Sequence, residues 1–531
     1  MEKLRLYARS VPITFESWII SFAAIVLIRT LFEQFPNFQL GHYVLIDLPT
    51  IVHYGASYLA IIVTLMIILL FFGKTNIQEV SVIGIFGFLV IWIAPVIDFM
   101  AGGVGGYLIS YFFIPAMELL WRFATFFGGN IDFGITLGIQ IETVLGILFC
   151  FFYVYTATKK VSRSLLAAFA FYCLIFSIFA LPSLIALFLP GGESPMPALV
   201  DSIASSHIVP NNMHPNSSLN NTGLVDLAFN KTMFGVNTII AIVASMLFFF
   251  LGTRKKFIAL IKNSRPERIF HFFLLFALGT ALGYQTWFTS WIDIQSYVLA
   301  FTSFIAAWMF SVCQNDIHDE NIDAISNPDR PLVAKELSRG DLEAASGIFL
   351  LFTFLCAYAA SHYTVFFVFM FLFVYFIYSN PPLRLKRFVI LNSFLVSLAC
   401  LSVIMAGFFL VSPDKTIVAF PAGFLIAIII FFTAVSNIRD IKDAEGDRAA
   451  GIKTLPVLLG VGRSKKIIAG VIIFFFILIP WYFRASFLFV PSLVASLLTW
   501  YFINQKDYKE WKGFAVYMAY LIFIIAVIFS K

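Results

Sequence analysis

The sequence predicts an all-α, polytopic membrane protein. Of the 531 residues, 60% are hydrophobic and only 12% are charged, whereas soluble domains carry about 25% charged residues. Apolar runs close to the ~20 residues needed to cross a bilayer recur along the chain; examples are 52–72, 233–251, 343–360 and 513–530. The runs are too long and too uniformly apolar for barrel strands, so helices must satisfy the backbone in lipid.

The net charge of +6 does not indicate a nucleic-acid partner. The basic residues stand between the apolar runs, where the positive-inside rule expects them. The lipid bilayer is therefore the expected partner, and no nucleic acid is expected.

A basic stretch at 254–268, which contains Pro266, divides the chain into an N-terminal module, 1–253, and a C-terminal domain, 262–531. The first half predicts a bundle of six or seven membrane segments. The firm ones are 17–32, 52–72, 79–100, 134–157, 164–190 and 233–252. A further apolar segment, 103–126, either crosses fully or is re-entrant, and we favour the second because every basic loop then faces the cytoplasm.

Five ionisable residues of the first half fall at apparent membrane depth. They are Arg29, Asp98, Glu118, Arg122 and Glu142. Such residues are functional candidates by default, and pairing among themselves is the structural alternative.

The second half predicts nine helices and a clear orientation. The helices are 269–288, 296–313, 343–361, 364–379, 389–411, 417–438, 467–483, 488–503 and 513–530. Every second connection is basic; these loops are 314–342, 381–388, 439–466 and 504–512. They hold sixteen Lys and Arg, and the opposite loops hold only Lys415 and Arg484. The asymmetry predicts a multi-pass protein of the cell membrane with the basic loops in the cytoplasm.

Two acidic motifs begin where apolar helices meet this side. In the first, Asn315, Asp319 and Asp323 are spaced four apart and share one face of a helix, with Asp316 beside them. The second motif has the spacing i, i+3, i+7, which again gives one face; its members are Asp440, Asp443 and Asp447.

Aspartates gathered at helix ends predict a bound divalent cation. Like charges held close disfavour ionisation, and the C-terminal end of a helix is the unfavourable end of the dipole for anions. Hard oxygen ligands indicate Mg²⁺ or Ca²⁺, and Mg²⁺ is the ion commonly shared with substrate phosphates.

A third element, Tyr378-Ser-Asn-Pro-Pro-Leu-Arg384-Leu-Lys386-Arg387, delivers three cations to the same face. We interpret it as a clamp on a diphosphate, because charge-assisted bonds to phosphate are strong. The alternative is an anchor that follows the positive-inside rule. The cations that could assist are Arg330, Arg439, Arg448 and Lys453.

These motifs carry a resemblance. NDxxDxxxD with NPDRPL, then YSxPPLRLK, then DxxDxEGDxxxGxxTLPxxxG resemble the UbiA superfamily of intramembrane prenyltransferases, in the family's order and over about 270 residues. The resemblance implies a helical bundle around a central cavity that opens to lipid. The family's metal ligands correspond to Asn315, Asp319, Asp443 and Asp447, and Asp316, Asp323 and Asp440 match further acidic positions. Arg439 stands where many members have Lys, which keeps the charge. No family is recognised for the first half.

The resemblance implies Mg²⁺-dependent transfer of a prenyl group from an isoprenyl diphosphate to an aromatic or lipid-type acceptor. Asp319, Asp443 and Asp447 are the expected catalytic residues. The metal and the cations would stabilise the departing diphosphate, and aromatic faces could stabilise the allylic cation. The alternative is a transporter or a non-catalytic scaffold with ion-coupling carboxylates. Transporters usually place such residues at the bilayer midplane, so we favour the enzyme.

Overall fold

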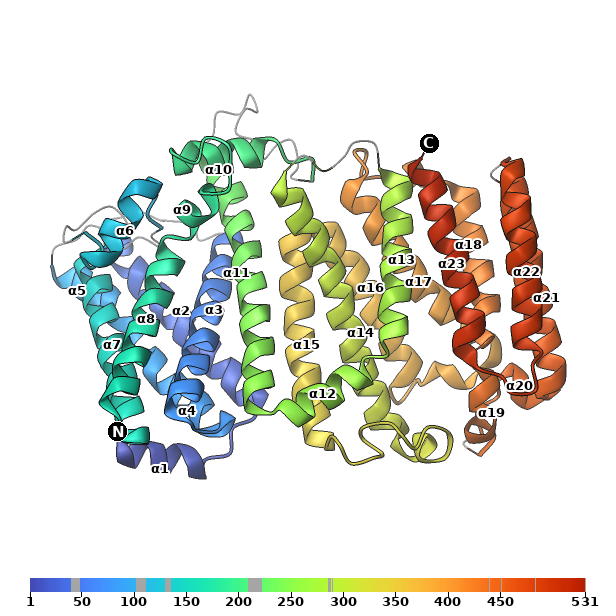
Figure 1. Cartoon of the computed structure of the whole chain (residues 1–531), viewed down its shortest axis with the longest axis horizontal. Coiled ribbons are helices and arrows are strands. Elements are labelled where there is room, and N and C mark those ends of the chain that lie inside the picture. Colours follow the sequence, from blue (N-terminus) through green and yellow to red (C-terminus); the bar gives the residue numbers. More distant parts are fainter. Residues whose placement is uncertain are drawn as a thin grey trace. The chain divides into compact units, whose positions relative to one another are not determined.

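The computed structural model describes residues 1–39, 48–101, 111–128, 135–208, 222–284, 288, 290–438, 440–449, 451–482 and 484–530. The regular elements within these ranges are helices (Figure 1). Thirteen are long and apolar enough to cross a membrane, or fourteen if one bent pair counts as a span. The predicted all-α, polytopic fold class is confirmed.

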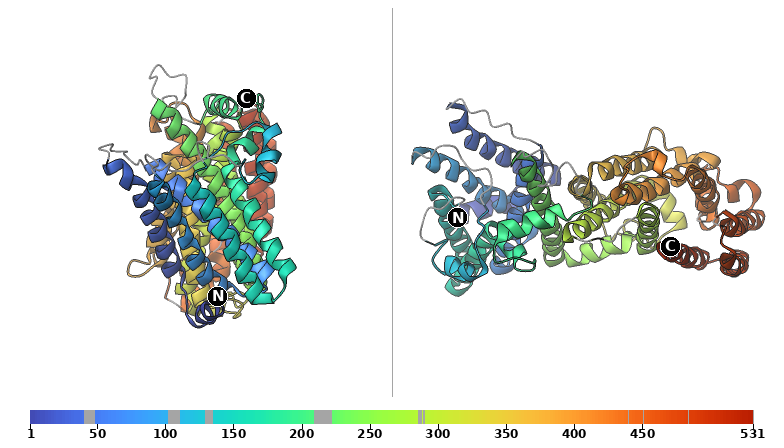
Figure 2. Two further views of the ribbon diagram at one scale, coloured as in Figure 1. Left: turned by 90° about the vertical axis from the view of Figure 1, so that its left-hand side faces the viewer. Right: turned by 90° about the horizontal axis from the view of Figure 1, so that it is seen from above.

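The chain forms two compact units. Unit 1 comprises Met1–Phe257 and Phe288–Ser296, and unit 2 comprises Ile258–Trp287 and Tyr297–Lys531. Within each unit the long helices run side by side, as the additional views in Figure 2 show. Helix α12 (Arg254–Asn263) contains the change from unit 1 to unit 2.

Unit 1 contains the six predicted membrane segments, which are confirmed as candidate spans. Its helices are α1 (Glu2–Ser10), α2 (Phe15–Gln39), α3 (Leu48–Gly73), α4 (Ile77–Phe88), α5 (Ile93–Met100), α6 (Ala116–Ala124), α7 (Leu137–Thr158), α8 (Val161–Phe179), α9 (Leu181–Ala186), α10 (Pro195–Ala204) and α11 (Thr222–Gly252). Helix α3 is apolar on all sides and contacts α11, α8, α4 and α7, so it forms the core of this unit.

The apolar segment 103–126 does not form a seventh span in its described part. Residues 102–110 lie outside the described residues, and α6 has nine residues, too few to cross a bilayer. Its Met117 and Leu120 are 91% and 76% exposed, which suits a helix that lies along a membrane surface.

Unit 2 contains the nine predicted helices. They are α13 (Pro266–Gly283), α14 (Trp291–Ser326), α15 (Arg339–Ala360), α16 (His362–Ser379), α17 (Val389–Val411), α18 (Ala422–Val435), α21 (Val461–Tyr482), α22 (Phe489–Ile503) and α23 (Glu510–Phe529). Two glycines let the backbones of α13 and α17 pack closely. A Cβ on Gly279 would lie 1.9 Å from the Ile404 carbonyl oxygen, and one on Gly407 would lie 2.2 Å from that of Phe276.

The boundaries around the two acidic motifs differ from the prediction. Helix α14 continues to Ser326, so the predicted loop 314–342 is wrong for residues 314–326. With 36 residues, α14 is about 54 Å long, and its last turns extend beyond an apolar core of about 30 Å. The predicted loop 439–466 contains two short helices, α19 (Asp440–Ala449) and α20 (Leu455–Leu459). The α19 helix is bent by 67° from the preceding helix.

Candidate active site

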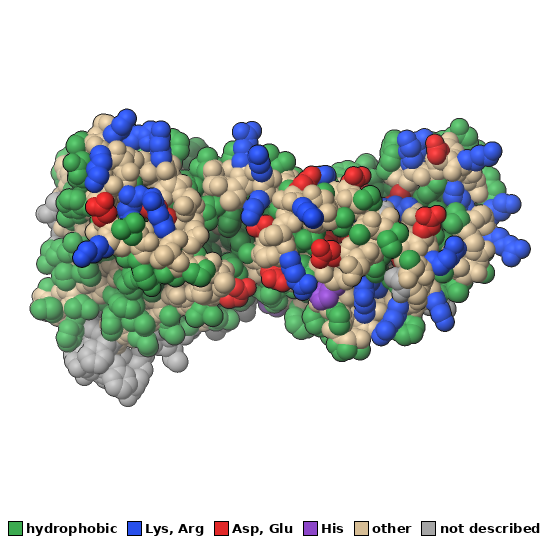
Figure 3. Space-filling model, turned by 90° about the horizontal axis from the view of Figure 1, so that it is seen from below, with side chains coloured by type: hydrophobic (Ala, Val, Ile, Leu, Met, Phe, Trp, Pro, Cys, Tyr) green, Lys and Arg blue, Asp and Glu red, His purple; other side chains and the backbone are tan. Residues whose placement is uncertain are grey.

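Both acidic motifs line one cavity of about 490 Å³ in unit 2. The α14 helix contributes Asn315, Asp319 and Asp323, and α19 contributes Asp440, Asp443 and Asp447. The helical spacing in each motif places its members on one face, and the fold turns the two faces toward the same space. Figure 3 shows this end of unit 2 at the right, where Lys and Arg side chains surround acidic ones.

The aspartates of the first motif are paired with cations from distant parts of unit 2. Arg384 Nη2 lies 2.5 Å from Asp319, and Lys386 also pairs with it. Arg330 pairs with Asp323 and lies 2.9 Å from Asp316. Arg265 contacts the same Asp316 oxygen at 2.7 Å. The cations offset the repulsion between neighbouring carboxylates, which is how polar residues remain on the buried face of α14.

The third sequence element contains one deeply placed cation and one surface cation. Lys386 is 7% exposed and donates to Asn315 Oδ1 at 3.2 Å as well as to Asp319. Burial lowers the pKa of Lys386, and the Asp319 carboxylate opposes this effect. Arg387, by contrast, is exposed and lies over the Phe388 ring. The diphosphate-clamp interpretation therefore suits Lys386, and the anchor interpretation suits Arg387.

The second motif accepts hydrogen bonds from amides and from a hydroxyl. Asn392 donates to Asp440 at 3.3 Å, and Thr454 donates to Asp447 at 3.3 Å. Asn327 follows α14 and donates to Asp323 at 3.3 Å and to Asp443 at 3.5 Å. One amide therefore joins the two motifs.

Three site residues were missed by sequence reasoning. They are Arg265, Asn327 and Asn392. Asn327 stands in the quoted NPDRPL segment, and Arg265 stands in the basic stretch, but neither position indicated a contact with an acidic motif. Asn392 lies in an apolar run, where a lone amide was the only available signal.

The structure does not bring every predicted cation to the cavity. Arg330, Lys386 and Tyr378 line it. Arg384 reaches it through Asp319, and Asp316 lies behind the lining, 2% exposed. Lys453 is exposed and is not among the lining residues. The predicted Arg439 lies outside the described residues.

Aromatic side chains also line the cavity: Phe272, Trp308 and Tyr375. The Phe272 and Trp308 rings meet edge to face at 5.2 Å between centroids, and Trp308 and Tyr375 do so at 5.6 Å. The lining thus combines charged groups with aromatic rings, whose faces can attract a cation.

The acidic residues suit a magnesium ion that is shared with a bound phosphate. Among the side chains that the structure describes, no three His, Cys, Asp or Glu residues converge closely enough to hold a metal ion alone. Mg²⁺ is usually held by one or two carboxylates together with substrate phosphates and not by an all-protein cage. Asp316 Oδ2 is buried without a hydrogen-bond partner. The donor set is thus oxygen-rich and spread over facing walls.

Known proteins resemble part of the chain. Chlorophyll synthase of Arabidopsis thaliana is 30% identical over 172 residues, which is 30% of this chain and 42% of the relative. Digeranylgeranylglyceryl phosphate synthase of Methanothermobacter thermautotrophicus is 30% identical over 191 residues, which is 35% of this chain and 57% of the relative. The chain thus spans about half the length of the curated relatives it matches.

Solved structures also match part of the chain. A UbiA homolog from Archaeoglobus fulgidus bound to GPP and Mg²⁺ is 20% identical, covers 51% of this chain and 100% of that chain, and has a TM-score of 0.41. The apo UbiA homolog from Aeropyrum pernix K1 is 21% identical and has a TM-score of 0.39. The match covers 50% of this chain and 97% of that chain.

The family match is confined to one part of the chain. Residues 272–524 match the UbiA prenyltransferase family, and this leaves the N-terminal half unassigned. The matched region contains both acidic motifs and most of the long helices of unit 2. The C-terminal half of this protein, over residues 272–524, therefore belongs to the UbiA prenyltransferase family.

Proposed function

We propose that the chain catalyses Mg²⁺-dependent transfer of a prenyl group from an isoprenyl diphosphate to a hydrophobic acceptor in the membrane. The observation that carries the proposal is the single cavity that both acidic faces line, together with Arg330 and Lys386. Its charged groups suit a diphosphate, and its aromatic side chains suit an isoprenyl chain.

Asn315, Asp319, Asp443 and Asp447 would hold Mg²⁺ jointly with the phosphate oxygens, with Asp316, Asp323 and Asp440 as further acidic groups. The ion supplies Lewis-acid stabilisation of the leaving diphosphate. Arg330, Arg384 and Lys386 are held by aspartates near the cavity. When the diphosphate arrives, these cations donate charge-assisted hydrogen bonds to it. The diphosphate thereby takes the place of a carboxylate as their partner.

The aromatic side chains that line the cavity act when the bond to the diphosphate breaks. As the bond to the diphosphate breaks, positive charge develops on the allylic carbon. The faces of Phe272, Trp308 and Tyr375 stabilise that charge, and their apolar surface keeps water from capturing it. The acceptor nucleophile then forms the new bond. We propose an aromatic or lipid-type acceptor, since chlorophyll synthase and digeranylgeranylglyceryl phosphate synthase are among the relatives.

We also propose the membrane orientation of unit 2 and separate roles for the two parts of the chain. The motif-bearing end of unit 2 faces the cytoplasm of a cell membrane, supported by the sixteen-to-two Lys/Arg asymmetry. Residues 262–531 act as the prenyltransferase domain, and residues 1–253 act as a separate membrane module.

The experiment uses the purified full chain in nanodiscs with labelled geranylgeranyl diphosphate and a lipid extract of the source. Pyrophosphate release with Mg²⁺ is compared with release after chelation, and mass spectrometry identifies the labelled product. The expected result is Mg²⁺-dependent release and one prenylated lipid. Folded protein that releases no pyrophosphate from any allylic diphosphate tested would favour the transporter or scaffold alternative.

A further inference from the structure

Unit 1 contains a group of charged side chains that prenyl transfer does not use. Arg29 on α2 donates to Glu33 at 2.5 Å, and both side chains are 6% exposed. The Arg29 guanidinium carbon lies 5.3 Å from the centre of the Tyr58 ring on α3. Glu142 on α7 interacts electrostatically with Arg29 and with Asp98 on α5. The fold thus gathers three of the charges at membrane depth that stood far apart in the sequence.

The charges in this group do not balance. One cation, Arg29, faces three carboxylates, and its ion pair neutralises Glu33. Asp98 accepts hydrogen bonds from Thr136 Oγ1 at 2.6 Å and from the Gly138 amide at 2.8 Å. These donors lie at the N-terminus of α7, where the helix dipole stabilises an anion.

Glu142 is the carboxylate that has no cation of its own: it accepts a hydrogen bond from the Ala94 backbone, and Arg29, the cation that it faces, is already paired with Glu33. Its Oε2 atom is buried and has no hydrogen-bond partner among the described residues. A buried carboxylate in that situation takes up a proton or pairs with a cation. The described side chains supply no further positive charge to this group, so the charge must come from a bound species.

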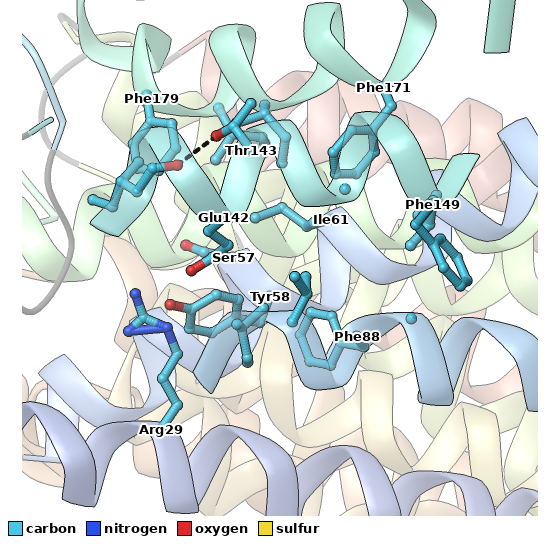
Figure 4. Close-up of a pocket in the computed structure, with 18 residues that line it drawn as sticks. Arg29, Ser57, Tyr58, Ile61, Phe88, Glu142, Thr143, Phe149, Phe171 and Phe179 are labelled. Carbon is cyan, nitrogen blue, oxygen red and sulfur yellow. Dashed lines mark hydrogen bonds between the residues drawn. The ribbon is translucent and has the colours of Figure 1, made fainter. Parts of the chain in front are cut away.

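Glu142 opens onto a cavity of about 60 Å³ that suits a small ion. Besides Glu142, the polar side chains that line it are Arg29, Ser57, Tyr58 and Thr143. In Figure 4 the Glu142 carboxylate, the Tyr58 hydroxyl and the Arg29 guanidinium point toward one another, and phenylalanine rings also line the cavity. One water needs about 10–15 Å³ of such volume. The cavity therefore admits a few waters or one small hydrated ion, but no organic substrate.

The hydroxyl groups around the cavity are oriented as acceptors. Thr143 donates its own hydrogen to the Ile139 carbonyl at 2.8 Å, and Ser57 donates to that of His53 at 3.0 Å. A hydroxyl that donates to the backbone keeps its lone pairs for another partner. Arg29 is 5% exposed, and its Nε also lacks a partner, so water or a hydrated ion in the cavity would satisfy donor and acceptor together.

We propose that Glu142 and this cavity bind one exchangeable monovalent cation. The cation is either a proton on the Glu142 carboxyl or Na⁺ held by Glu142 and the oxygens of Ser57, Tyr58 and Thr143. The groups that face the site are Arg29 and Glu33 from α2, Tyr54 and Tyr58 from α3, and Asp98 from α5. A single positive charge balances the one carboxylate, Glu142, that has no cation of its own. Unit 1 thereby acquires a cation-binding activity that is independent of prenyl transfer.

The test uses the purified full chain in nanodiscs, with infrared spectra recorded across pH and with ²²Na⁺ binding. Glu142→Gln is compared with Glu193→Gln, which alters an exposed carboxylate of the same unit. A bound proton gives a carboxylic-acid carbonyl band that disappears at high pH and is absent from Glu142→Gln alone. Bound Na⁺ gives one ²²Na⁺ per chain, lost in Glu142→Gln and retained in Glu193→Gln.

Two further variants keep Glu142 in place. They serve if a thermal melt shows that Glu142→Gln is not folded. Thr143→Val removes one oxygen ligand and weakens Na⁺ binding by about tenfold, the effect of about 1.4 kcal/mol. Asp98→Asn removes a neighbouring negative charge and moves the titration of the band to lower pH. The proposal is overturned if the folded wild type shows neither a titrating carboxylic-acid band nor bound Na⁺. It is overturned equally if none of the three variants at the site alters either signal.

Discussion

Replacing Asp319 with asparagine tests the ion pairs beside the candidate active site. Asp319 accepts from Arg384 at 2.5 Å and pairs with Lys386, whose side chain is buried. Asparagine keeps the size of the side chain but removes its charge. Removing one member of a buried ion pair destabilises a protein by about 3–5 kcal/mol. Because Arg384 is 32% exposed and Lys386 keeps Asn315 as an acceptor, we expect the lower end, about 3 kcal/mol.

The expected loss of activity can be measured separately from the loss of stability. Losing a group that stabilises the transition state lowers turnover by at least about 10²-fold, measured as Mg²⁺-dependent pyrophosphate release in nanodiscs. Adding Lys386→Met removes the stranded ammonium, so the thermal midpoint returns toward wild type while activity stays low. Near-normal prenyl transfer by Asp319→Asn at ordinary Mg²⁺ would refute the metal assignment. A double variant no more stable than Asp319→Asn would refute the ion-pair argument.

Three further predictions follow from the same site. Asp443→Asn is expected to abolish pyrophosphate release while leaving the protein folded, whereas Asp414→Asn, at an exposed position, leaves release unchanged; equal effects would remove Asp443 from the site. Single cysteines at the exposed positions Arg339 and Arg463, in a background without the native cysteines, are expected to react with an impermeant reagent from the same side of sealed vesicles. Labelling from opposite sides would contradict the shared active site. A chain of residues 262–531 is expected to retain prenyl transfer, because every site residue lies in unit 2; a folded but inactive product would show that the first half contributes to catalysis.

The sequence alone determined the fold class and the chemistry of the motifs. An apolar run predicts a membrane span directly, because a helix needs about 20 apolar residues to cross a bilayer whichever helices it packs against. The helix predicted at 389–411 has the observed bounds, Val389–Val411, and Pro413 stands just after its end. Helical spacing also places each acidic motif on one face, because that periodicity belongs to the helix itself and not to its neighbours.

The extent of the helix that carries the first motif was decided by tertiary contacts. The apolar run ends at 313, and the sequence therefore predicted that the membrane helix ends there, although the spacing of the acidic motif is helical. Residues 314–326 are also rich in Asn and Asp, which disfavour helix interiors on their own. In the folded protein, Arg265, Arg330 and Lys386 pair with these aspartates from positions 7 to 67 residues away, and the helix continues. Local propensity could not contain that information.

The same limit applies to the charges of unit 1. The sequence placed Arg29, Asp98 and Glu142 at membrane depth, but it did not show that these side chains lie near one another. Nor did it show that Glu33 pairs with Arg29, which leaves Glu142 without a cation of its own. Which charge pairs with which depends on how α2, α5 and α7 pack. Composition and periodicity indicate which face of a single segment contacts water or lipid. The balance of charge in a buried site depends on several helices together.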